Sequence, residues 1–248
     1  MDRLLEATHL AERRHFWFHG FRRFVGPLLE KAARGRRDLD LLDCGCGTGA
    51  NLALLERYGR ATGIDLTMRG LEFAKGYGRS RLARASVTHL PFPDAQFDVL
   101  TSFDVLYALP DAEETLALAE MRRVLRPGGA VVINVAALEI LRGNHSVLGG
   151  EVRRYSRREL RSHVARAGFA VERLTYTNAT TFPLVLAVRL AQRFSGFAKS
   201  AEEATAEITV PAGPINAVLS SLLAVEAGLA RHVSLPFGSS LLCLAWKR

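Results

Sequence analysis

Three glycines alternate with other residues in the stretch Asp43–Gly49, which overlaps the end of an apolar run at 39–43. Glycine has no Cβ atom, so its backbone adopts left-handed conformations easily and another molecule can approach it closely. A helix-like pattern begins at residue 48, and the free amides and positive dipole end of a helix N-terminus attract ligand groups. Because a tight turn usually needs only one glycine, the three glycines indicate a ligand that lies against this loop.

Two carboxylates accompany the glycine loop. Asp43 stands two residues before Gly45, where it can hold an amino group of a ligand. Asp65 ends the next apolar run, 20 residues beyond Gly45, where a carboxylate can accept two hydrogen bonds from a ribose diol. The loop and this acid therefore predict a nucleoside-containing cofactor. The spacing Gly45-x-Gly47-x-x-Ala50 also satisfies the dinucleotide-binding pattern, so a nucleotide-dependent oxidoreductase stays open on these residues alone.

The elements that must position these residues alternate along the chain. Strand-like apolar runs lie at 39–43, 61–65, 97–102 and 129–135, with weaker ones near 82–87, 170–176 and 239–246. Helical patterns between them occupy 48–58, 67–78, 111–125 and 156–168. Asp111-x-x-Glu114 and Ser156-x-x-Glu159 are capping signals for two of these helices. The alternation predicts an α/β fold with a doubly wound, mostly parallel sheet, which binds ligands beyond the carboxyl ends of its strands.

Two segments lie outside the alternation. Residues 1–37 are predicted to be helical and carry the aromatic cluster HFWFHGFRRF. Residues 178–236 are apolar, helical and broken by four prolines, and they interrupt the expected closing pair of strands. We therefore expect four parts: an N-terminal helical cap at 1–37, a core at 38–177, a helical insertion at 178–236 and a last core strand at 237–248.

Composition narrows the class of protein. The 248 residues are 48% hydrophobic, which fits a folded α/β domain, and 33 Lys and Arg exceed 25 Asp and Glu to give a net charge of +8. The arginines are scattered over helical segments without interleaved aromatic residues, so we expect no nucleic-acid partner. Cys44, Cys46 and Cys243 make no disulfide framework and too few ligands for a metal. With no signal-peptide pattern at 1–10 and no apolar run long enough to span a bilayer, a cytoplasmic protein is expected.

Two further motifs narrow the choice of cofactor. LPFPDAQFDVL occupies 90–100 and RVLRPGGAVVINV occupies 123–135. With the loop at 43–49 and Asp65, these motifs stand in the order found in the class I S-adenosylmethionine (SAM)-dependent methyltransferases. Over about residues 39–176 the chain resembles this family, particularly its type 11 group. The resemblance implies a Rossmann-like sheet of seven strands, with SAM as cofactor across the ends of strands one, two and four.

The resemblance also implies roles for individual residues. Asp43 and the glycine-loop backbone are expected to hold the methionine moiety, and Asp65 the ribose hydroxyls. Ser86 stands where relatives often carry an Asp that contacts adenine, so adenine recognition is expected to fall more to the backbone of Val87 and to packing by Leu66. An N-terminal helix commonly covers the cofactor in this family, and aromatic faces suit a sulfonium cation. The full expected SAM-binding set is Asp43, Gly45, Cys46, Gly47, Gly49, Asp65, Leu66, Ser86, Val87, Phe103, Trp17 and Arg22.

Candidates for catalysis are fewer. His145 lies in the loop RGNHSVLGG, expected on the ligand side, and a histidine can act as a base near neutral pH. Tyr155 opens the segment YSRREL and is the second candidate. Glu226 falls on an apolar helical stripe, where a carboxylate is costly unless it is paired or used. It either pairs with a neighbour such as Arg231 or faces the pocket and orients the substrate. The stripe consists of Ile215, Val218, Leu219, Leu222, Leu223 and Leu229.

The chain is therefore predicted to be a SAM-dependent methyltransferase that acts on an oxygen or nitrogen atom of a small-molecule or lipid-like acceptor. One alternative is the oxidoreductase, which should lack both Asp43 and the Arg126–Gly129 turn. The other is a non-catalytic SAM-binding protein. The insertion at 178–236 is expected to cover the substrate; contact with a membrane or with a second subunit stays open for the same segment.

Overall fold

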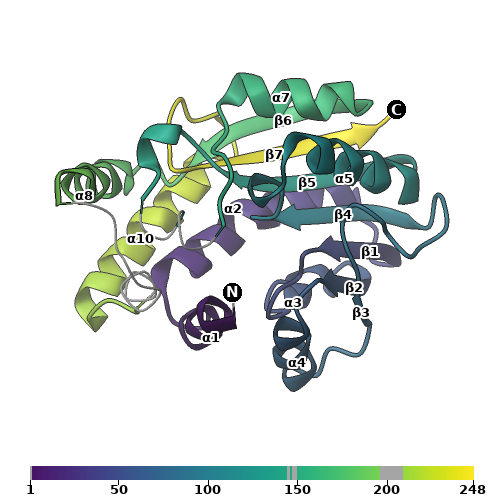
Figure 1. Ribbon diagram of the computed structural model, residues 1–248, viewed down its shortest axis with the longest axis horizontal. Helices are drawn as coiled ribbons and strands as arrows, with labels where there is room; N and C mark the ends of the chain where they lie inside the picture. The colour runs from purple at the N-terminus through teal and green to yellow at the C-terminus, as the bar shows by residue number, and fades with distance from the viewer. Residues whose placement is uncertain (1, 144–145, 147–149, 196–208) are drawn as a thin grey trace.

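A seven-stranded sheet with the order β3-β2-β1-β4-β5-β7-β6 forms the centre of the structure (Figure 1). The structure is a computed structural model and describes residues 2–143, 146, 150–195 and 209–248. The neighbouring strands β3, β2, β1, β4 and β5 pair in parallel. Strand β7 is antiparallel to both of its neighbours, β5 and β6. The predicted doubly wound, mostly parallel sheet is confirmed. The strands are β1 Leu39–Cys44, β2 Gly59–Asp65, β3 Leu82–Arg84, β4 Phe97–Phe103, β5 Leu125–Ala136, β6 Phe169–Thr177 and β7 Ser240–Lys247.

Helices connect the strands much as the sequence pattern predicts. The predicted helix at 48–58 is only Leu52–Leu55, because the left-handed backbone of Gly49 delays its start and a turn at Tyr58 leads into β2. The capping box of Ser156 and Glu159 is present, whereas Asp111 is not a cap, because the helix begins at Asp111 after Pro110. The helices are α1 Asp2–Ala11, α2 Phe16–Ala33, α3 Leu52–Leu55, α4 Met68–Gly76, α5 Asp111–Val124, α7 Arg157–Arg166, α8 Phe182–Ser195 and α10 Gly213–Leu229, with short 3-10 turns η1 Leu106–Ala108 and η2 Glu139–Leu141.

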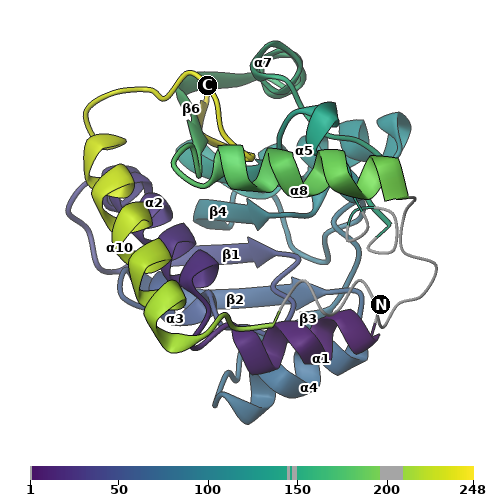
Figure 2. The ribbon, with the colours of Figure 1, turned by 90° about the vertical axis from the view of Figure 1, so that its left-hand side faces the viewer.

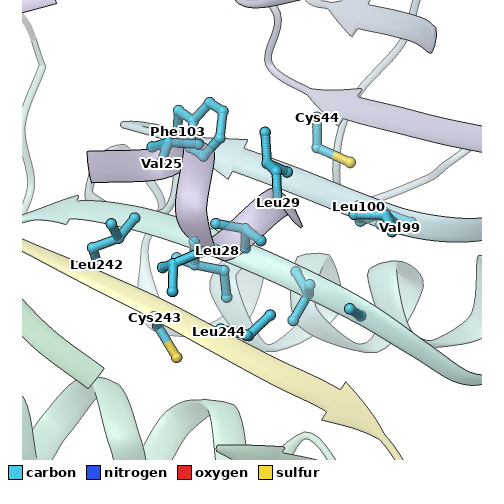
Figure 3. Close-up of a cluster of buried hydrophobic side chains, with 14 of the residues drawn as sticks. Val25, Leu28, Leu29, Cys44, Val99, Leu100, Phe103, Leu242, Cys243 and Leu244 are labelled. Carbon is cyan, nitrogen blue, oxygen red and sulfur yellow. The ribbon is translucent and has the colours of Figure 1, made fainter. Parts of the chain in front are cut away.

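Helix α2 belongs to the core of the sheet, although the sequence places it in the N-terminal cap. Figure 2 shows α2 and α10 on one side of the strands and α5 on the other. The buried side chains Val25, Leu28 and Leu29 of α2 lie among those of β1, β4 and β7 (Figure 3). Burial of such aliphatic side chains contributes roughly 1.5–3 kcal/mol each. Only α1 of the predicted cap therefore lies outside the main core.

Between β6 and β7 the chain forms α8 and α10, as the predicted helical insertion requires. The apolar stripe predicted for this segment is divided between two environments. Leu223 and Glu226 are buried on the side of α10 that packs against α2, whereas Val218 and Leu222 are exposed. The members of the stripe differ in exposure because α2 covers only one edge of it.

The contact between α2 and α10 yields a test with a built-in control. A Cβ atom on Gly20 would lie 2.5 Å from Cδ1 and 2.9 Å from Cβ of Leu223, whereas one on Gly26 would meet no atom within 4 Å. Gly26→Ala should raise the free energy of unfolding by about 0.5–1 kcal/mol, since alanine favours the helix. Gly20→Ala should lower it by about 1–2 kcal/mol, because overpacking outweighs that gain. Urea unfolding followed by circular dichroism measures both, and equal effects would show that α10 does not pack closely on Gly20.

Candidate functional site

The glycine loop lies at the carboxyl end of β1, where the strand order reverses between β1 and β4. The amides of Gly45 and Cys46 both donate to the carbonyl of Ile64 in β2, at 2.9 and 2.8 Å. These bonds fasten the start of the loop to the neighbouring strand. The loop therefore occupies the edge at which doubly wound sheets bind their ligands.

The three glycines of the loop differ in what a side chain at each position would meet. All have positive φ angles: 83° at Gly45, 51° at Gly47 and 74° at Gly49. A Cβ atom on Gly45 would lie 2.3 Å from Cγ2 of Val105, and one on Gly49 would lie 2.6 Å from Cβ of Ala74. A Cβ atom on Gly47 would meet only Leu5, at 3.8 Å. Packing within the chain is therefore a sufficient reason for Gly45 and Gly49 to lack a side chain, whereas Gly47 leaves room for an approach; contact of the three with a ligand stays a prediction.

Asp43 is a buried carboxylate directly before this loop. Its side chain is 1% exposed, and its Oδ1 accepts a hydrogen bond of 2.6 Å from the hydroxyl of Thr101 in β4. Burial raises the pKa of this carboxyl to about 7. A buried carboxylate is costly unless a cation or hydrogen-bond donors compensate it. An amino group of a ligand would supply that compensation.

Asp65 holds the glycine loop in addition to any part it plays in ribose binding. One carboxylate oxygen accepts the amide of Gly47 at 2.8 Å, and the other accepts the amide and hydroxyl of Thr67 at 2.8 and 2.5 Å. Each carboxylate oxygen has about two acceptor sites, so three of the four are occupied and one, on the oxygen that accepts Gly47, is left for a ribose hydroxyl. The ribose role stays a prediction.

The residues expected at adenine lie beside the ends of β2 and β3. The hydroxyl of Ser86 forms a hydrogen bond of 2.7 Å with that of Thr88, and Val87 is buried. Leu66 is exposed, and its carbonyl accepts a hydrogen bond from Arg84. The exposed side chain of Leu66 offers apolar surface to a flat base, and contact of adenine with Leu66 and with the Val87 backbone stays a prediction.

An aromatic group joins α2 to the end of β4. The ring of Trp17 stacks on Phe21 with centroids 5.5 Å apart, and Phe21 meets Phe103 edge-on at 5.0 Å. The sequence-predicted residues Trp17 and Phe103 thus belong to one aromatic group. Arg22 makes a different contact: its guanidinium donates a hydrogen bond of 3.0 Å to the carbonyl of Glu12.

Glu12 was not predicted from the sequence, yet it connects α1 to the glycine loop. Its side chain is buried and accepts hydrogen bonds from the hydroxyls of Thr48, at 2.6 Å, and Tyr77, at 2.9 Å. Thr48 belongs to the loop and Tyr77 follows α4, so a single carboxylate joins three segments. In the sequence Glu12 stands beside Arg13 and Arg14 and has the appearance of an exposed helix end.

Asp104 is a second carboxylate that the sequence analysis missed. It follows β4 in a left-handed conformation with φ of 59°, next to Val105, which packs against Gly45. Its Oδ1 accepts a hydrogen bond of 2.9 Å from the side-chain amide of Asn134 at the end of β5. Desolvation raises the pKa of the Asp104 carboxyl to about 7. Its position at a strand end, one residue beyond Phe103, is the sequence signal that points to it.

Of the three expected catalytic residues, the structure describes Tyr155 and Glu226, and each is held by contacts of its own. His145 lies outside the described residues. Tyr155 is 1% exposed and its hydroxyl donates to the carbonyl of Leu106, and burial raises its pKa. Glu226 accepts the amides of Ala179 and Thr180, both at 2.8 Å, just before α8. Tyr155 is therefore a core residue and not a group placed for proton transfer. Glu226 holds the backbone before α8, and this contact replaces the expected pairing with Arg231 or with substrate.

Cys46 contributes a buried thiol to the loop. Both Cys44 and Cys46 are buried and free, and burial raises the pKa of each thiol. Such thiols behave as small apolar fillers. The expected cofactor contact at Cys46 is therefore one that its backbone would make.

The raised pKa of Asp43 has a consequence for stability. The folded protein binds this proton more tightly than the unfolded chain does, so the stabilisation is present at low pH and is lost as pH rises from about 4 through about 7. Asp43→Asn should therefore have a higher melting temperature than the natural protein near pH 8, and the difference should shrink near pH 5. Scanning fluorimetry at both pH values measures this.

Asp38→Asn is the matched control for this measurement. Asp38 is exposed, and a hydrogen bond from Arg36 lowers its pKa, so its replacement should give no gain at pH 8. A melting temperature of Asp43→Asn below that of the natural protein at pH 8 would show that the Asp43 carboxylate serves folding rather than a ligand.

Comparisons with known proteins agree with this architecture. The family described as methyltransferase domain matches residues 42–133, which include the glycine loop, Asp65 and Asp104. A Mycolicibacterium smegmatis protein named as a probable S-adenosylmethionine-dependent methyltransferase is 31% identical, over 66% of this chain and 62% of its own length. The demethylmenaquinone methyltransferase of Staphylococcus aureus is 38% identical, over 39% of this chain and 43% of its own length.

A solved structure with the same fold is that of the cyclase SpnF, with a TM-score of 0.58 and 21% identity over 90% of this chain and 79% of that chain. This likeness concerns the fold alone. The chain spans between 36% and 66% of the length of the first four curated relatives that it matches.

Proposed function

Because the chain belongs to the class I SAM-dependent methyltransferases, we propose that it transfers a methyl group from SAM to an oxygen or nitrogen atom of a small, lipid-like acceptor. The observation that carries this proposal is the buried carboxylate of Asp43 at the start of the glycine loop, with Asp65 at the end of the neighbouring strand. Asp43 offers an anion to an amino group, and Asp65 offers acceptors to a diol. A nucleotide-dependent oxidoreductase does not require a carboxylate at the position of Asp43.

Each part of the site would hold one part of the cofactor. Asp43 would pair with its ammonium group, Asp65 would accept a hydrogen bond from its ribose, and Leu66 would pack against its adenine beside the backbone of Val87. Trp17 and Phe103 offer aromatic surface to the sulfonium. When bound, SAM supplies a methyl group that an oxygen or nitrogen nucleophile can displace.

Asp104 is the residue best placed to orient an acceptor. It lies beyond the end of β4, beside the residue that packs on Gly45, and Asn134 holds its carboxylate from the neighbouring strand. A carboxyl with a pKa of about 7 can accept a proton from an acceptor hydroxyl or ammonium at neutral pH. Holding the nucleophile in line can itself supply roughly 7–11 kcal/mol. The lipid-like class is supported by the relative that is named a demethylmenaquinone methyltransferase.

Asp65→Ala tests the cofactor assignment. Loss of one ribose hydrogen bond to a charged acceptor, worth about 1.5–3 kcal/mol, should weaken SAM binding by about 10- to 150-fold in isothermal titration calorimetry. Circular dichroism must show an intact fold, since the same carboxylate holds Gly47 and Thr67. Unchanged affinity in a folded variant would contradict the ribose role.

The activity itself is tested by incubating the protein and SAM with a library of small hydroxylated, amine-containing and isoprenoid compounds. Mass spectrometry should detect a product that has gained one methyl group. Asp104→Asn should reduce its rate of formation by about 10²-fold or more, the scale of a lost general base, with little change in SAM affinity. SAM binding without any methylated product would instead favour a non-catalytic SAM-binding protein.

A further inference from the structure

One face of α10 exposes five apolar side chains. They recur at alternating intervals of three and four residues, so they form a continuous ridge along the helix. Val225 is 75% exposed, and the others are each at least 42% exposed. Single exposed apolar residues are ordinary, whereas a contiguous row of them marks an interaction surface. The ridge consists of Ile215, Val218, Leu222, Val225 and Leu229.

Helix α8 carries further exposed apolar side chains on the same side of the molecule. Its side chains Leu184, Val188 and Leu190 are exposed, and Figures 1 and 2 show α8 and α10 on the same side of the molecule. Within 182–195 and 213–229 the only acidic residue is Glu226, and it is buried against the start of α8. The outer sides of both helices therefore carry no negative charge among the described residues.

Three arginines lie next to α10: two near its ends and one, from α2, on the side away from the ridge. The carbonyl of Arg14 accepts a hydrogen bond from Asn216 at the start of α10, and the guanidinium of Arg23 donates to the carbonyl of Ser220. Arg231 follows the end of the helix. All three arginines are exposed. A helix with an exposed apolar ridge and exposed arginines next to it is complementary to a surface that combines hydrocarbon with negative charge.

We infer that the outer faces of α8 and α10 dock the protein on an anionic lipid bilayer. Interfacial helices bury their apolar side about 5–10 Å into the bilayer while basic residues meet the anionic head groups. A second copy of the chain is a poorer occupant, because it would bring Arg14, Arg23 and Arg231 against their own equivalents. The described helices include none that is both long and apolar enough to cross a bilayer, so this contact is peripheral. The inference depends on the surface alone and stands apart from the methyl-transfer proposal.

Flotation with unilamellar vesicles tests the docking surface on the full chain. The protein should float with vesicles of equimolar phosphatidylcholine and phosphatidylglycerol and stay at the bottom with phosphatidylcholine alone. Val218→Glu combined with Val225→Glu should weaken the binding on the order of tenfold or more, since two apolar contacts are lost. Arg14→Gln and Arg231→Gln should each weaken it about fivefold, and raised salt should act in the same direction.

Leu116→Glu is the matched control. Leu116 is 55% exposed on α5, close to the 60% of Val218, and its replacement should leave vesicle binding unchanged. Absence of binding to the anionic vesicles, or equal binding by the Val218 and Val225 double variant, would overturn the inference. So would a concentration-dependent dimer in analytical ultracentrifugation that the double variant abolishes while vesicles bind nothing. SAM titration of each variant, which should be unchanged, keeps this result separate from the test of the cofactor site.

Discussion

The carboxylate of Asp65 fixes the part of the structure on which the site depends. It gathers the amide of Gly47 and two donors of Thr67 around the end of β2. The loop between β1 and α3 thereby keeps its left-handed turns, and α4 begins directly after Thr67. Glu12 reinforces the arrangement from the other side through Thr48. Two acidic side chains from distant segments thus hold the loop by hydrogen bonds, in addition to its packing against Val105 and Ala74.

The same edge of the sheet also carries carboxyls that are costly to ionise. Asp43 at the end of β1 and Asp104 after β4 both have pKa values raised to about 7 by desolvation. Their strands are neighbours in the sheet, so this edge concentrates carboxyls whose ionised form a cationic or hydrogen-bond-donating ligand would favour. Perturbed carboxyls of this kind cluster at functional sites more often than elsewhere. A structural role alone does not account for two of them on adjoining strands.

The sequence predicts the parts of this protein that local pattern controls. The strands of the sheet, the capping box at Ser156 and the glycine loop are each visible over a few residues. Contacts between distant segments are not: Glu12 reaches Thr48, and Gly49 meets Ala74. Glu226 is a second example. The helical periodicity of the sequence places this carboxylate on an apolar stripe, but it does not reveal that Glu226 accepts hydrogen bonds from the amides of Ala179 and Thr180. Asp104 went unnoticed because its significance comes from Asn134 and Val105 rather than from any motif.

The position of β7 has a consequence for how the chain acquires this fold during synthesis. β7 lies between β5 and β6 in the sheet, yet the ribosome makes it after both of them and after α8 and α10. Until β7 emerges, the free side of β5 and the whole of β6 present unpaired backbone groups, the kind of edge that invites pairing with other chains. Nascent protein therefore has a vulnerable interval that ends only when residues 240–247 leave the exit tunnel. A stretch of slow codons or a truncation before β7 would prolong that interval, and chaperone engagement would be greatest there.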